Sequence, residues 1–173
     1  MLENFLIGAA GSLTASIVFL IFLFYYLRPK VCISPHIAKR INERGWLPAY
    51  TFKIINETPY PVVDIRIEII LYTPRNISNW QINDATILAR HERFELDSPK
   101  KLSEPFGNET YYTYEGLEEK WNDDRQHVVF RVMVRHSLTQ FSRVFSHSYY
   151  RKGACIKLGQ FANVPSLDVV TEG

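Results

Sequence analysis

The feature that most constrains this sequence is an uninterrupted apolar run close to its N-terminus. Residues 5–27 carry no charged side chain, and a helix of that length, at about 1.5 Å per residue, would cross a hydrocarbon layer of about 30 Å. A cleaved signal peptide is the alternative, but residues 1–4 lack Lys and Arg, and bulky side chains continue to the end of the run. The sequence therefore predicts a single transmembrane helix over residues 5–27, preceded by a short tail over residues 1–4.

Positive charge follows the predicted helix and is missing before it, where Glu3 is the only charged side chain. Basic residues concentrate on the cytoplasmic side of membrane proteins, so we expect the N-terminus outside and the large domain in the cytoplasm. Basic side chains next to a membrane also attract anionic lipid headgroups. The predicted headgroup contacts lie in a basic juxtamembrane segment, residues 28–45, and are Arg28, Lys30, Lys39, Arg40 and Arg44.

Three tripeptides favour the opposite orientation. Asn56, Asn76 and Asn108 each begin an Asn-X-Ser/Thr acceptor for N-glycosylation, a modification of the extracytoplasmic side. Such tripeptides also occur by chance, and Pro59 follows the first of them directly. An extracytoplasmic domain therefore stays open as the alternative topology.

Small residues recur along the predicted helix at spacings of three and four, which places them on one side of it. A stripe of this kind lets two helix backbones approach closely and is typical of helix–helix contacts in membranes. The predicted packing residues are Gly8, Gly11, Ser12, Ala15 and Ser16. They favour a homo-oligomer, and the alternative is a single helix surrounded by lipid.

After residue 29 the apolar block gives way to alternation, which is the period of β-strands. The clearest strands are residues 50–55, 62–72 and 127–136, where apolar side chains occupy every second position. Weaker strands are expected at residues 31–34, 85–96, 109–114, 143–150 and 154–158. Residues 35–45 read as a short juxtamembrane helix, and residues 115–121 read as a helical turn.

Seven or so short strands with turn residues between them predict a mainly β domain over residues 46–170 with a tail at 171–173. The expected fold is an antiparallel immunoglobulin- or fibronectin-like β-sandwich, or a small barrel. The resemblance is architectural, because the chain lacks the Cys, Trp, Cys spacing of antibody domains.

Signals for catalysis or metal binding are missing from the sequence. It has no G-x-S-x-G turn and no glycine-rich phosphate loop, and its five histidines and two cysteines, Cys32 and Cys155, lack metal-ligand spacing. The net charge of +2 and pI of about 8.5 do not indicate a dedicated nucleic-acid binder. We therefore expect no enzyme activity, no metal and no cofactor, while an active site assembled from scattered loop residues stays open.

One group of basic residues suggests anion recognition. Arg131 and Arg135 share a face of the strand at 127–136, and Arg90 and Arg93 lie in a neighbouring segment. The guanidinium fork suits phosphate groups through paired hydrogen bonds. The alternative is that these arginines are solvated charges on the wet face of a sheet.

Two functional hypotheses follow from an anchor joined to a domain without catalytic motifs. The first is a binding, scaffold or accessory subunit that presents its sheet to a partner at the inner membrane face. The second is a self-assembling membrane effector, pore-forming or membrane-disrupting, gated by a nucleotide or nucleic-acid ligand on its β-domain. The second is similar, in layout only, to membrane-anchored β-domain effectors of bacterial defence systems.

Overall fold

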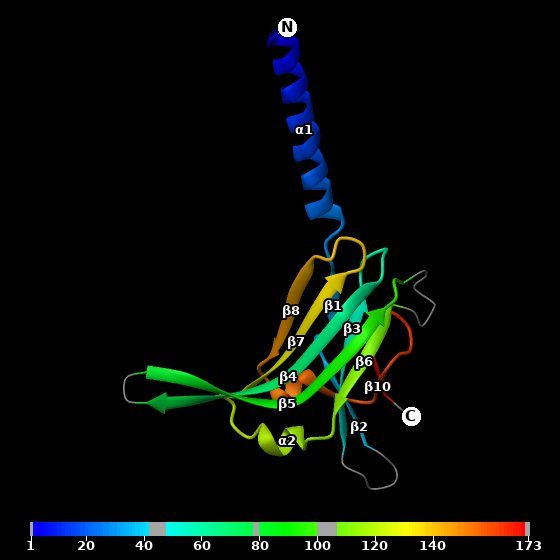
Figure 1. Ribbon diagram of the computed structural model, residues 1–173. Coiled ribbons are helices and arrows are strands. Elements are labelled where there is room, and N and C mark those ends of the chain that lie inside the picture. Colours follow the sequence, from blue (N-terminus) through cyan, green and yellow to red (C-terminus); the bar gives the residue numbers. More distant parts are fainter. Residues whose placement is uncertain (1, 42–47, 78–79, 100–106, 172–173) are drawn as a thin grey trace.

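The computed structural model describes residues 2–41, 48–77, 80–99 and 107–171. Helix α1 (Leu2–Tyr26) stands away from a β-rich body, and none of its apolar window is buried (Figure 1). It is long and apolar enough to cross a membrane. The expectation of a mainly β chain with an N-terminal apolar helix is confirmed.

The first sheet contains the two strands that the sequence predicts best. Its order is β5-β4-β7-β8, all antiparallel, with β5 at Trp80–Leu96, β4 at Val62–Ile77, β7 at His127–His136 and β8 at Ser142–Tyr149. Ile67 and Ile69 of β4 and Phe130 and Val132 of β7 are at most 1% exposed. The predicted inward faces of both strands are therefore correct.

The second sheet is built around β3 (Ala49–Asn56). β6 (Asn108–Thr113) pairs with one edge of β3, while β1 (Val31–Ile33) and β2 (Ile37–Arg40) follow each other along the opposite edge. β9 (Ile156–Leu158) then pairs with β2 in parallel. The strands expected at residues 31–34 and 109–114 are thus both present.

The inner faces of the two sheets form one apolar core. Phe52 of β3 stacks on Phe130 of β7 with ring centroids 5.0 Å apart and an interplanar angle of 2°. The Tyr149 hydroxyl donates a hydrogen bond to the Ser34 carbonyl across the core at 2.6 Å. Along one side the sheets also meet directly, because the His91 ring of β5 lies 2.8 Å from the Tyr112 carbonyl of β6.

Four short elements complete the described part of the chain: α2 (Leu117–Lys120), α3 (Lys152–Cys155), β10 (Gln160–Phe161) and β11 (Val169–Val170). α2 confirms the helical turn expected at residues 115–121. It is fixed by Trp121, which is 2% exposed and donates its indole N–H to the Gln126 carbonyl at 3.0 Å.

Two local expectations are wrong. Residues 37–40 form β2 rather than part of a juxtamembrane helix, because Ile37 and Ala38 are fully buried and the segment pairs with strands on both sides. The rest of that expected helix, residues 42–47, lies outside the described residues. The strand expected at 154–158 begins only at Ile156, because α3 occupies the residues before it.

β4 and β5 are longer than the sequence indicates. β4 continues to Ile77 rather than ending at residue 72, and β5 begins at Trp80 rather than at residue 85. The extra length forms a two-stranded arm, residues 73–77 and 80–86, that projects sideways from the body (Figure 1).

Candidate interaction surfaces

The arm has one apolar and one polar face. Residues that pair across antiparallel strands share a face, which groups Ile77 with Trp80 and Arg75 with Ile82. Ile77 and Ile82 are each 48% exposed and Trp80 is 79% exposed. The opposite face carries the pairs Asn76–Gln81 and Pro74–Asn83. The arm is therefore an amphipathic ribbon whose apolar side faces solvent.

Both backbone edges of the arm are open within the described residues. Pairing between β4 and β7 ends at Tyr72 and His127, so beyond that point β4 has β5 as its only described partner. Open strand edges present N–H and C=O groups to any further strand. Sequence reasoning missed this element, although Trp80 and Ile82 alternate with Gln81 and Asn83 as strand residues do.

The predicted anion-binding arginines lie among carboxylates. On the outer face of the first sheet, Glu68 accepts from Arg90 at 3.3 Å and lies 3.5 Å from Arg131. Arg135 lies 3.0 Å from Asp64, which has a positive φ of 51° at the irregular stretch of β4. Because each guanidinium already has an acidic neighbour, an anionic ligand would have to displace a carboxylate here.

Arg93 is separate from the other three arginines. It pairs with Ile65 in the ladder and reaches Glu109 of β6, with 3.3 Å between Nε and Oε2. The pair borders a cleft of about 730 Å³ whose walls also include Asn108 and Phe161. The structure therefore brings Arg131 and Arg90 together around Glu68 and places Arg93 at a different surface.

A buried cation beside this cleft was not singled out by the sequence. Lys53 of β3 is fully buried, because the C-terminal segment crosses the outer face of the second sheet. Its ammonium donates to the carbonyls of Ala162 and Val164 at 2.5 and 2.6 Å and lies 5.9 Å from the Phe161 ring centre. Burial lowers the pKa of Lys53 to about 8.

The predicted headgroup contacts are divided between the two ends of the body. Arg28 and Lys30 are exposed next to α1, and the Arg28 guanidinium lies 5.5 Å from the Tyr25 ring centre. Lys39 and Arg40 belong to β2, at the end of the body away from α1 (Figure 1). Lys39 is bonded there to Glu118, whose pKa it lowers. Arg44 lies outside the described residues.

The predicted helix-packing residues are all accessible on α1. Gly8, Gly11, Ser12, Ala15 and Ser16 are exposed, and a Cβ added at either glycine would meet no atom within 4 Å. The Ser16 hydroxyl donates to the Ser12 carbonyl at 2.9 Å. This hydroxyl is therefore satisfied by its own helix.

Cys32 and Cys155 are free thiols, and among the described residues no cluster of His, Cys, Asp and Glu has the make-up of a metal site. Comparison with known proteins supplies no relative: no family model matches the sequence, and no curated protein matches it either. Proposals about function accordingly start from the surfaces described above.

Proposed function

We propose that this protein is a membrane-anchored β-domain that acts as a binding or scaffold subunit, with the β4–β5 arm as its contact element. The observation that carries this proposal is the exposed apolar face of the arm, formed by Ile77, Trp80 and Ile82. Exposed aromatic side chains in apolar clusters are typical centres of protein–protein interfaces. The anchor would keep this contact at the membrane.

The arm suits a protein partner better than a small ligand. It is a ribbon without an enclosing wall, about 17 Å long for five paired positions at about 3.4 Å each. A partner can cover the apolar face with its own apolar surface and pair a strand with an open edge. The Arg75–Asp84 pair, 3.7 Å apart on the same face, adds a polar margin.

The order of the strands supports the finer fold proposal. The sheet β5-β4-β7-β8 would correspond to strands C′, C, F and G of an immunoglobulin-like domain, opposite a sheet formed by β1 with β2, β3 and β6. Domains of this architecture commonly serve recognition rather than catalysis. An immunoglobulin- or fibronectin-like fold therefore agrees with a binding role.

Cytoplasmic placement of the β-domain is part of the proposal, and one argument against it is weakened. Asn56 is fully buried, and its Nδ2 donates to the carbonyls of Tyr60 and Asp97 at 2.9 and 3.1 Å. The Asn56 Oδ1 accepts from the Thr58 hydroxyl at 2.6 Å. A glycan on Nδ2 is incompatible with these contacts, so this tripeptide has a structural role in the fold.

Site-specific photocrosslinking tests the arm. A photoreactive residue would replace Trp80 or, as a matched control on the opposite face, Asn83, in the full chain within its native membranes. We expect an adduct of defined mass from position 80 and none from position 83. Equal labelling from both positions, or no adduct from either, would contradict the proposal. An adduct of twice the chain mass would identify a second copy as the partner.

The oligomeric effector is a second candidate because the small-residue stripe of α1 is fully accessible. We would measure the mass of the full chain in mild detergent by light scattering and compare it with the Gly8→Leu, Ser12→Leu double variant. A defined oligomer lost in the variant, together with loss of dye entry into expressing cells, supports the effector. A monomer in both rules out packing through this stripe.

A further inference from the structure

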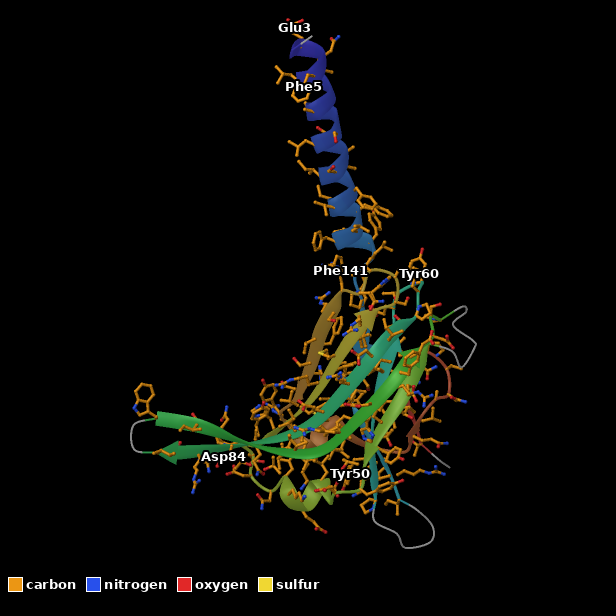
Figure 2. The ribbon with its side chains drawn as sticks, in the orientation of Figure 1. Glu3, Phe5, Tyr50, Tyr60, Asp84 and Phe141 are labelled. Carbon is orange, nitrogen blue, oxygen red and sulfur yellow. The ribbon has the colours of Figure 1, made fainter. Side chains whose placement is uncertain are left out.

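The β7–β8 turn, residues 137–141, lies against the end of α1. The Thr139 hydroxyl donates to the Leu27 carbonyl at 2.9 Å. The Phe141 ring stacks on that of Phe24, with centroids 5.0 Å apart and an interplanar angle of 5°. Figure 2 shows Phe141 and Tyr60 at the end of the body nearest the helix.

The turn is a rigid projection. The His136 amide donates to the Phe141 carbonyl and the Gln140 amide to the His136 carbonyl, each at 2.9 Å. The His136 Nδ1 accepts from the amides of Leu138 and Thr139 at 3.3 and 3.4 Å. These bonds hold Leu138 outward, where it is 61% exposed. An apolar side chain is thus displayed at the tip of a braced turn.

A second loop supports the same surface. The Ser137 amide donates to the Pro61 carbonyl at 3.3 Å, and the Tyr60 ring meets the His136 ring edge-on with centroids 5.6 Å apart. Tyr60 is 38% exposed. Its backbone carbonyl is held by the buried Asn56 and Thr58 side chains. Leu138, Tyr60 and Phe141 therefore form one surface beside the helix.

The depth of this surface follows from the helix. Phe24 precedes Leu27 by three residues, about 4.5 Å along the axis at about 1.5 Å per residue. In a spanning helix that ends at Tyr26, Phe24 and Tyr25 lie in the interfacial layer, where aromatic side chains are favoured. Because Phe141 stacks on Phe24, the β7–β8 turn must share that layer.

We propose that the β7–β8 turn is a second membrane contact, which inserts Leu138 into the bilayer interface beside α1 with Tyr60 at its margin. This inference rests on the proposed membrane anchor. Two points of contact fix the orientation of the body, so that the β4–β5 arm is directed sideways from a fixed position below the membrane (Figure 1). Lipid is the occupant of this surface because the surface is continuous with the apolar helix.

Depth-dependent quenching tests the proposal in the full chain. In a Cys32→Ser, Cys155→Ser background, an environment-sensitive fluorophore is attached at Leu138→Cys, at Asn83→Cys on the arm, or at Ile17→Cys within α1. Each protein is reconstituted into phosphatidylcholine and phosphatidylglycerol vesicles with or without lipids that carry a quencher near the headgroup. We expect a blue-shifted, quenched probe at position 138 and an unquenched probe at position 83.

The outcomes separate the two levels of the proposal. If position 17 is shielded within the membrane while position 138 behaves like position 83, the anchor stands and the second contact is overturned. If a high-pH wash releases the protein and position 17 is solvent-exposed, both are overturned. A probe at 138 that is blue-shifted but insensitive to the lipid quencher places protein rather than lipid over the turn, which also overturns the proposal.

Discussion

Lys53 shows how one residue can couple two distant parts of the chain. It lies in the middle of β3, and its described hydrogen bonds run to two carbonyls of the C-terminal segment. A buried cation with backbone acceptors has a high desolvation cost, which its hydrogen bonds offset in part. The residue therefore fastens the C-terminal segment and also makes the fastening sensitive to pH.

Replacing Lys53 should change how stability depends on pH. Burial lowers the pKa of Lys53 from 10.5 to about 8, so between these values the unfolded chain binds more protons than the folded chain. Through this residue the free energy of unfolding rises with pH across that window. The stability of the native chain relative to Lys53→Met should accordingly increase as pH rises from 8 to 10.5. Denaturant unfolding of both proteins in detergent measures this, and a difference that does not vary with pH would contradict it.

Asn56 supports a different residue-scale prediction. Asn56→Ala removes a fully buried amide and leaves the Tyr60 and Asp97 carbonyls without this donor. We expect the free energy of unfolding to fall by about 2–3 kcal/mol, the usual range for buried polar groups that lose a partner. The matched control is Asn76→Ala on the exposed arm, which should change stability by less than about 0.5 kcal/mol. Fluorescence of the buried Trp121 follows unfolding.

At the scale of elements, β4 combines two environments in a single strand. Its first half lies between β5 and β7, whereas residues 73–77 have only β5 beside them among the described strands. An isolated pair of strands is marginally stable in water, while a strand inside a four-stranded sheet opens only with the whole fold. Regular pairing in the arm therefore does not imply equal stability.

Hydrogen exchange should reveal this difference. In the full chain in detergent, amides at 74–77 and 81–84 should exchange much faster than those at 66–70, which lie in the four-stranded part of the sheet. Mass spectrometry of peptides from the two halves of β4 provides the measurement. Equally slow exchange in both halves would mean that the arm is covered, and repeating the measurement over a dilution series would show whether a second copy covers it.

At the scale of the whole molecule, the helix and the β-body are nearly independent. α1 is exposed along its length, and it meets the body through the Phe24–Phe141 stack and the Thr139–Leu27 hydrogen bond. The shared core of the two sheets contains no residue of α1. The helix is therefore an addition to the fold rather than a part of it.

Removing the helix should leave the body folded. We expect residues 28–173 to be soluble and to unfold with a free energy within about 1–2 kcal/mol of the full chain, because only one hydrogen bond and one ring stack are lost. Near-ultraviolet circular dichroism and denaturant titration compare the two proteins. An aggregated or unfolded fragment would show that α1 contributes to the fold after all.

The sequence alone determined the features that depend on local pattern. An apolar run is a helix in any context that lacks water, and alternation in β4 and β7 fixes which side chains face inward. The helical turn at α2 follows from equally local signals. Every one of these features could be predicted because neighbouring residues along the chain carry the information.

The tertiary structure decided what depends on partners from elsewhere in the chain. β2 is a strand because β3 and β9 lie on either side of it, and Lys53 is buried because the C-terminal segment covers it. The arginines expected to bind anions acquired carboxylate neighbours from adjacent strands, and the arm exists because β4 and β5 pair beyond the reach of β7. Such contacts join residues far apart in sequence, so no local pattern specifies them.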